Sequence, residues 1–138
     1  GIPFARPPLG ALRWSSPVQE QAWNEVRSAV SYGSACMQER SVFEDDSFVE
    51  ISEDCLYLNV YQPQTSSTQK DKNSTSEAGL PIMLFFHGGA YYSGAGSFTV
   101  YDATRRVAKL ASAGIPTIIV TANYRLGPFG YLGSNELR

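Results

Sequence analysis

Two apolar runs separated by a segment of helical spacing constrain the fold of this chain most strongly. Residues 80–86 and 115–122 carry no charged side chain, which is typical of strands in a sheet covered on both faces. Between them, apolar residues recur at helical spacing over 102–113, with Asp102 as the predicted N-cap and Gly114 as the predicted stop. A strand, a helix and a strand in this order predict a right-handed crossover in a mainly parallel sheet, and therefore an α/β fold.

The first half of the chain predicts extended segments. Residues 1–14 hold three prolines, which favour extended chain with bends, and residues 56–61 alternate in polarity as a strand does before Pro63 ends it. Residues 17–31 fit either a short helical turn or an irregular excursion. Residues 64–79 are rich in Ser and Thr and predict an exposed loop between strands of one domain.

A glycine-rich turn, residues 87–96 with the sequence H-G-G-A-Y-Y-S-G-A-G, directly follows the first apolar run. Gly88 and Gly89 permit positive φ, so this turn can aim free N–H groups at one point. Such N–H dipoles stabilise an oxygen that gains negative charge during acyl transfer, although glycine pairs also occur in plain turns. The chemical interpretation is favoured because residues 123–127 also follow a predicted strand, and ligands of α/β sheets bind at the carboxyl ends of strands.

Composition excludes several classes of partner. The net charge of −2 predicts no attraction to nucleic acid. No apolar run approaches the roughly 20 residues that span a bilayer, and residues 1–10 lack the pattern of a signal peptide.

Because the sequence has no initiating Met and no closing element after residue 133, we expect it to be a segment of something longer.

Cys36 and Cys55 can form a disulfide or remain as two free thiols. Their spacing suits a surface loop closed by one bridge. It does not suit zinc, because there is no second cysteine pair and His87 is the only histidine, so we predict no metal and no cofactor. Asn73 begins an N-x-[ST] acceptor for glycosylation, and together with a disulfide it favours a secreted or lumenal location.

Four blocks of the chain resemble a known family, in that family's order. Residues 53–63, E-D-C-L-Y-L-N-V-Y-Q-P, fit its second signature at every position, and residues 1–14 are similar to its N-terminal block. Residues 87–90 match its oxyanion-hole loop, and residues 122–130 resemble the block before its nucleophile. The family is the type-B carboxylesterases, which include cholinesterases, fungal lipases and insect esterases. The resemblance implies that residues 1–138 are the N-terminal portion of a single α/β-hydrolase domain, with antiparallel N-terminal strands beside a mainly parallel sheet.

The resemblance implies roles for individual residues of the glycine-rich turn. The backbone N–H groups of Gly89 and Ala90 would supply two of the three donors of an oxyanion hole, with Gly88 and His87 supporting the turn. Family members often have glycine at the position of Ala90. Alanine keeps the N–H group, but its methyl narrows the acyl side of the site.

The resemblance also implies that Cys36 pairs with Cys55. In cholinesterases the loop enclosed by this disulfide carries a tryptophan that faces a quaternary ammonium group. Here the loop contains only Phe43 and Phe48 as aromatic residues, so we do not expect a choline ester as substrate. The implied substrate is a small carboxylic ester or a lipid.

A serine esterase of this family also needs a serine on a G-x-S-x-G elbow, followed by an acid and a histidine. The sequence contains no such pentapeptide, and Ser112 in L-A-S-A-G ends a predicted helix, so we predict a structural role for it. His87 is likewise predicted to be structural. We therefore expect the triad to lie downstream and the isolated chain to be inactive. The alternative is a non-catalytic, cholinesterase-like adhesion protein on the same fold.

Overall fold

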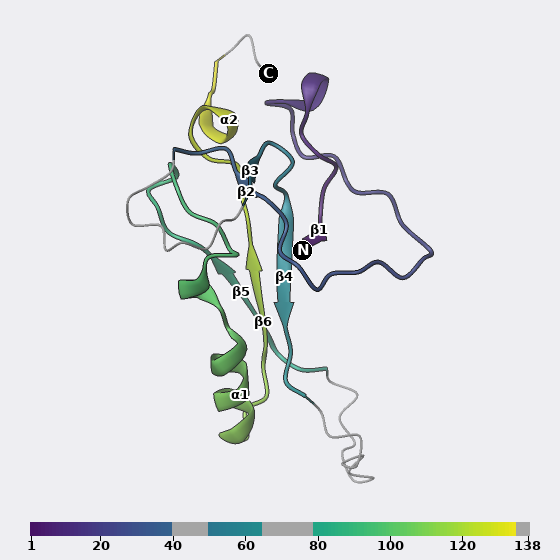
Figure 1. Cartoon of the computed structure of the whole chain (residues 1–138), viewed down its shortest axis with the longest axis vertical. Helices are drawn as coiled ribbons and strands as arrows, with labels where there is room; N and C mark the ends of the chain where they lie inside the picture. Colours follow the sequence, from purple (N-terminus) through teal and green to yellow (C-terminus); the bar gives the residue numbers. More distant parts are fainter. Residues whose placement is uncertain (40–49, 65–78, 135–138) are drawn as a thin grey trace.

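The structure is a computed structural model that describes residues 1–39, 50–64 and 79–134. Its organising feature is a four-stranded sheet in the order β1-β4-β6-β5 (Figure 1). The bounds of these strands are Ile2–Pro3 for β1, Tyr57–Tyr61 for β4, Ile82–Phe86 for β5 and Ile118–Ala122 for β6. β5 and β6 are parallel, whereas β4 is antiparallel to β6 and β1 is antiparallel to β4. The predicted α/β class and the antiparallel N-terminal strands are confirmed.

Helix α1 (Thr104–Ser112) provides the crossover between the parallel strands and packs on the sheet (Figure 1). Its buried residue Val107 contacts Ile119 of β6, and Ala103 completes this cluster. The half-buried Tyr61 and Leu110 lie at its border. The strand, helix and strand expected from the two apolar runs are therefore present, and burial of one helix face holds them together.

The N-terminal end of α1 differs from the sequence prediction by one residue. Asp102 was the predicted N-cap, but Ala103 occupies that position. Asp102 lies outside the helix because its N–H group donates to Thr99 O at 3.1 Å, which closes a 3-10 turn over Thr99–Tyr101. The carboxylate still accepts the Thr104 N–H group at 2.8 Å, so Asp102 satisfies a free helix donor from one position further back.

The C-terminal end of α1 confirms Gly114 as the predicted stop. Gly114 has φ of +78°, and its N–H group donates to Ala111 O at 3.1 Å. The Ile115 N–H group donates to Leu110 O at the same distance. These two bonds form a Schellman motif, which glycine favours because it adopts positive φ without strain.

The first apolar run does not have the burial that the sequence predicts. In β5, Ile82 is 67% exposed and Phe86 is 60% exposed. β5 pairs with β6 on one side and is the last strand of the described sheet on the other. The expectation that residues 80–86 are covered on both faces is therefore wrong for the described chain, because Ile82, Leu84 and Phe86, which alternate along β5 and so share one face, are all exposed.

The remaining described elements are short. They are β2 (Ala35–Cys36) parallel to β3 (Ile51–Ser52), helix α2 (Gly127–Tyr131) and a 3-10 turn at Gly10–Leu12. Residues 17–31 form the irregular excursion, and Val26 in it is fully exposed. None of the helices in the described ranges has the length and apolar character that a membrane crossing requires.

Candidate functional site

Two loops emerge side by side at one edge of the sheet. The glycine-rich turn follows β5 and residues 123–127 follow β6, and these strands are parallel with Phe86 opposite Ala122. Helix α2 lies at this same end of the sheet (Figure 1). The loops share an open cavity of about 610 Å³, lined by Phe86, His87, Gly88, Ala90, Tyr91, Tyr124 and Tyr131. The two loops that the sequence places after neighbouring strands therefore line one cavity, and this cavity is rich in aromatic side chains.

The backbone of the glycine-rich turn has three consecutive residues with positive φ. The values are +126° for Gly89, +53° for Ala90 and +62° for Tyr91. The N–H groups of Tyr92 and Ser93 both donate to Gly89 O, at 2.9 and 3.0 Å. Within the described residues, the N–H groups of Gly89 and Ala90 donate to no backbone carbonyl. The turn therefore satisfies the donors of Tyr92 and Ser93 internally, and the N–H groups of residues 88–91, those of Gly89 and Ala90 included, have no backbone acceptor among the described residues.

Glycine is required at residue 89 for a second reason besides φ. A Cβ atom at Gly89 would lie 1.8 Å from Ser93 O. This oxygen is a backbone atom, so it cannot shift as the end of a flexible side chain can. Ala90 and Tyr91 carry side chains in left-handed conformations, each at a cost of about 1–2 kcal/mol. Strain of this kind persists only where surrounding contacts determine the conformation, as at many functional sites.

His87 is a buried part of the turn and only 3% exposed. Its Nδ1 lies 2.9 Å from Gly88 O, and because a carbonyl only accepts, Nδ1 carries the proton. Nε2 is buried and has no hydrogen-bond partner among the described residues. Burial lowers the pKa of His87, so the imidazole is neutral at pH 7. Gly94 makes room for it, since a Cβ atom there would lie 2.3 Å from Nδ1.

Tyr124 attaches His87 to the neighbouring loop. Its ring stacks on the imidazole, and its hydroxyl donates to His87 O at 2.7 Å. Burial raises the pKa of Tyr124, so the hydroxyl keeps its proton for this bond. The sequence prediction placed residues 123–127 near the turn but did not identify Tyr124 as a contact.

Asn123 makes three hydrogen bonds to three different segments. Its Oδ1 accepts the Gly96 N–H group at 2.8 Å, and its Nδ2 donates to Ser34 O and Cys55 O, both at 3.0 Å. This buried amide therefore connects the end of the glycine-rich turn to the region of the disulfide. Neither this residue nor Gln38, which contacts Gly94, was singled out by sequence reasoning, because their partners are distant in the chain.

Cys36 and Cys55 form the disulfide, with their Cα atoms 4.9 Å apart. Both sulfurs are buried in a cluster with Ala5, Leu56 and Leu126. The pairing implied by the family resemblance is confirmed. Because Leu126 lies in the loop after β6, the disulfide supports the same end of the sheet as the candidate site.

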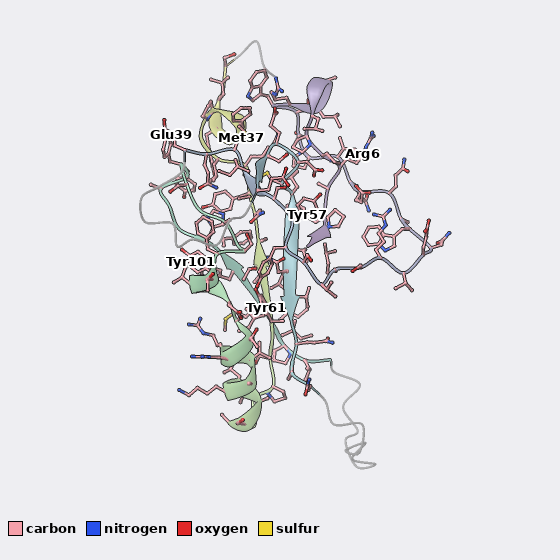
Figure 2. All side chains as sticks on the ribbon, viewed as in Figure 1. Arg6, Met37, Glu39, Tyr57, Tyr61 and Tyr101 are labelled. Carbon is pink, nitrogen blue, oxygen red and sulfur yellow. A yellow bond between two sulfur atoms is a disulfide. The ribbon has the colours of Figure 1, made fainter. Side chains whose placement is uncertain are left out.

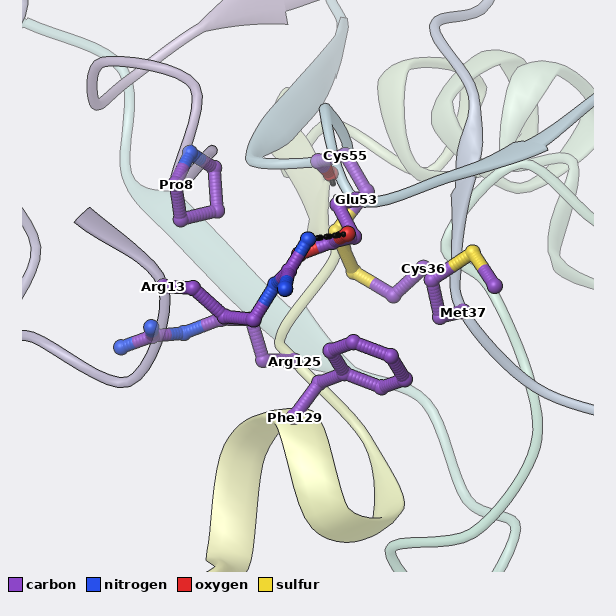
Figure 3. Close-up of a pocket in the computed structure, with 8 residues that line it drawn as sticks. All are labelled: Pro8, Arg13, Cys36, Met37, Glu53, Cys55, Arg125 and Phe129. Carbon is purple, nitrogen blue, oxygen red and sulfur yellow. Dashed lines mark hydrogen bonds and ion pairs between the residues drawn. A yellow bond between two sulfur atoms is a disulfide. The ribbon is translucent and has the colours of Figure 1, made fainter. Parts of the chain in front are cut away.

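A bidentate ion pair lies beside the disulfide (Figure 3). Arg13 Nε and Nη2 donate to the two carboxylate oxygens of Glu53, at 2.5 and 2.6 Å. This hydrogen bonding lowers the pKa of Glu53 and raises the pKa of Arg13. The adjoining cavity holds about 10 Å³, room for a single water at most, so we assign the pair to structure. Its lining residues are Pro8, Arg13, Cys36, Met37, Glu53, Cys55, Arg125 and Phe129.

The other predicted residues do not join the site. Ser112 is the last residue of α1, and its Oγ donates to Ala108 O at 3.0 Å, as its predicted structural role requires. Asn73, Phe43 and Phe48 lie outside the described residues. In the part of the chain that the structure describes, no three histidine, cysteine or acidic side chains gather as metal ligands do.

Comparison with known proteins gives consistent matches over the whole sequence. The model of the carboxylesterase family matches residues 1–138. The para-nitrobenzyl esterase of Bacillus subtilis (strain 168) is 46% identical over 135 residues, which are 96% of this chain and 24% of that protein. Carboxylesterase 5A of Canis lupus familiaris is 38% identical over 144 residues, 99% of this chain and 22% of its own length.

A solved structure shares the fold. A thermophilic PNB esterase superposes with a TM-score of 0.82 and 38% sequence identity, over 99% of this chain and 26% of that one. The chain thus spans about a quarter of the length of the proteins it matches.

Proposed function

Because the chain belongs to the carboxylesterase family, we propose that it contributes the oxyanion-hole turn of a serine carboxylic-ester hydrolase. One observation carries this proposal: the consecutive N–H groups of Gly89 and Ala90 have no backbone acceptor among the described residues and lie at the carboxyl end of β5. The aromatic cavity in front of Ala90 supplies space for an ester.

In the proposed reaction, a serine outside residues 1–138 attacks the ester carbonyl carbon. The carbonyl oxygen becomes an oxyanion, and the N–H groups of Gly89 and Ala90 donate to it without reorganising. The alcohol leaves as the acyl-serine forms, and water then hydrolyses that intermediate. Loss of one such donor typically lowers the rate by about 100 to 1000-fold.

His87 is not the base in this proposal. Its Nδ1–H is engaged by Gly88 O, and its Nε2 is buried away from solvent. A general base must come within hydrogen-bond reach of the proton it takes. We therefore assign proton transfer to a histidine outside residues 1–138, and we assign His87 to supporting the turn together with Gly88.

We propose that residues 1–138 form the N-terminal portion of a single α/β-hydrolase domain and are inactive alone. The absence of a G-x-S-x-G elbow from these 138 residues supports this, as does coverage of about a quarter of the matched esterases. The proposed substrates are small carboxylic esters or lipids. The net charge of −2 gives no reason to expect a nucleic-acid partner.

We place the protein in a secreted or lumenal compartment. The disulfide between Cys36 and Cys55 supports this location, because such bonds persist in oxidising compartments. The glycosylation acceptor at Asn73 agrees with it.

The test compares the 138-residue chain with the longest product of its transcript on a short-chain p-nitrophenyl ester. The 138-residue chain should release no p-nitrophenol above a heat-denatured control, whereas the longer product should turn over. A fluorophosphonate should label one serine of the longer product. A longer product without a G-x-S-x-G elbow and without turnover would refute the esterase proposal and favour the non-catalytic adhesion alternative.

A further inference from the structure

The side-chain amide of Gln38 is bound to the backbone of Gly94 through both of its polar atoms. Gln38 Oε1 accepts the Gly94 N–H group at 2.7 Å, and Nε2 donates to Gly94 O at 2.9 Å. Nε2 also donates to Cys36 O at 3.1 Å. The amide orientation is fixed by its partners, because a flipped amide would put its nitrogen against a donor and its oxygen against two carbonyls.

This contact joins two segments that are 56 residues apart in the sequence. Gln38 follows Cys36 by two residues, so the disulfide to Cys55 fixes the backbone from which its side chain extends. The neighbouring Met37 and Glu39 lie at the same end of the sheet as α2, where the candidate site is found (Figure 2).

The peptide that Gln38 holds is the one that packs against Gly89. The Gly94 N–H group and Ser93 O belong to the same peptide unit, and Ser93 O would lie 1.8 Å from a Cβ atom at Gly89. The Ser93 N–H group also donates to Gly89 O at 3.0 Å. A rotation of the Ser93–Gly94 peptide would therefore displace Gly89, and with it the direction of the Gly89 and Ala90 N–H groups.

We propose that Gln38 is a positioning residue for the oxyanion hole. It acts through Gly94: by fixing the peptide that packs on Gly89, it keeps the backbone of Gly89, and with it the N–H groups of Gly89 and Ala90, in one conformation. This role rests on the proposed function of the turn. It also connects the disulfide to the site, since the loop closed by Cys36 and Cys55 carries the amide that holds the turn.

The test begins with amide hydrogen exchange of residues 87–96 in the longer chain that contains residues 1–138, comparing wild type with Gln38→Met. Methionine matches glutamine in length but makes none of its three hydrogen bonds. Exchange of the Gly94 amide should become about tenfold faster, as loss of about one hydrogen bond predicts. Gln21→Met, at an exposed glutamine, is the matched control and should leave this exchange unchanged.

Gln38→Glu provides a conservative variant in case methionine disturbs folding. A carboxylate keeps the acceptor for the Gly94 N–H group but loses the donor for Gly94 O. Its Gly94 amide should therefore remain better protected than in Gln38→Met. Equal exchange in wild type and Gln38→Met would overturn the inference.

Kinetics of the longer esterase chain separate positioning from stability. In Gln38→Met, kcat should fall about tenfold while KM stays within about twofold, because the lost interaction matters in the transition state. Affinity for a trifluoromethyl ketone should fall in parallel with kcat. Faster exchange with unchanged kcat would overturn the positioning role. A wild-type chain without esterase activity would instead refute the proposed function, while the exchange comparison still decides whether Gln38 holds the turn.

Discussion

Tyr124 lies flat against His87, with ring centroids 4.3 Å apart and the planes tilted by 12°. The Tyr124 hydroxyl also donates to the main-chain oxygen of His87 at 2.7 Å. One side chain from the loop after β6 therefore holds both the ring and the backbone of the first residue of the glycine-rich turn. The stack and the hydrogen bond can be separated by mutation, because phenylalanine keeps the ring and removes only the hydroxyl.

Tyr124→Phe should lower the free energy of unfolding by about 1 kcal/mol, since the oxygen of buried His87 loses its donor. Urea unfolding measures this change. Tyr131→Phe is the control, because Tyr131 is exposed and its ring is kept. Equal stability losses in the two variants would show that the Tyr124 hydroxyl bond contributes nothing specific.

The pH dependence of stability should report burial of His87. Its native pKa is lowered by burial, whereas an unfolded histidine titrates near 6.5. Below the pKa of the unfolded histidine, the unfolded chain binds more protons than the native one. The contribution of His87 to stability is therefore fully present above the unfolded pKa. It is lost as the pH falls from the unfolded pKa toward the lower native pKa. Wild type should therefore lose stability as the pH falls below about 6.5, and it should be less stable at about pH 5.5 than at about pH 7.5.

His87→Gln isolates this effect, because His87 is the only histidine in the sequence. Carboxylates titrate equally in both proteins, so the difference between their pH slopes belongs to the imidazole. Urea midpoints at the two pH values give the slopes. A variant slope as steep as that of wild type would contradict the prediction.

Local patterns were sufficient to predict the elements that carry the site. Apolar runs without charge located β5 and β6, helical spacing located α1, and the position after each strand brought the two loops together. The prediction that β5 is buried on both faces was wrong. The exposure of a strand depends on which other strands and helices pack against it, and the sequence of β5 contains no information about these neighbours. The N-cap was displaced because a 3-10 turn ended at Tyr101 and left Asp102 just outside the helix.

The contacts that shape the turn could not be predicted from local patterns. Gln38 and Gly94 lie 56 residues apart, and Asn123 and Ser34 lie 89 apart. Any glutamine or asparagine could make such bonds, so only the folded chain selects these two. The family resemblance implied the disulfide, which is confirmed, and the donor roles of Gly89 and Ala90, which stay a proposal; it did not indicate the residues that hold the turn in place.

Gly89→Ala should disrupt the turn more than any other single methyl addition there. The variant residue would have to adopt φ of +126° and would place Cβ 1.8 Å from Ser93 O. Strain of this kind costs about 1–3 kcal/mol, and displacement of the donors should lower ester hydrolysis by at least about 100-fold.

The matched control for Gly89→Ala is Gly133→Ala. A Cβ atom at Gly133 meets nothing within 4 Å, so the same chemical change should leave both stability and ester hydrolysis unchanged. Thermal unfolding of the 138-residue chain and p-nitrophenyl ester hydrolysis by the longer chain provide the two measurements. Normal activity in Gly89→Ala would refute a role for this backbone in catalysis.

Loss of the disulfide should weaken the whole fold. Cys36 and Cys55 are 19 residues apart, and closing a loop of this size stabilises by about 3 kcal/mol in the chain-entropy model. The double variant Cys36→Ser/Cys55→Ser should therefore unfold at a lower urea concentration than the oxidised chain. Dithiothreitol should destabilise wild type and leave the double variant unaffected; an equal effect on both would contradict this account.

Ala90→Gly is the reverse of Gly89→Ala, because it removes a methyl group from the turn and keeps the N–H donor. Ala90 has φ of +53°, which glycine adopts without the left-handed strain, so the turn should remain formed. Ala90 also lines the aromatic cavity, and its methyl is expected to narrow the space for the acyl group. Because a single methylene in a pocket changes specificity by about 10 to 200-fold, removal should favour bulky acyl groups.

The expected readout of Ala90→Gly is a ratio and does not depend on enzyme concentration. The kcat/KM of the longer chain for p-nitrophenyl isobutyrate, divided by that for the acetate, should rise by about tenfold. Hydrolysis of the acetate should stay within about threefold of wild type, since the N–H groups of both proposed oxyanion donors, residues 89 and 90, are retained. An unchanged ratio with full acetate activity would place the acyl group away from Ala90, and a loss of acetate activity would show that the methyl itself holds the turn in shape.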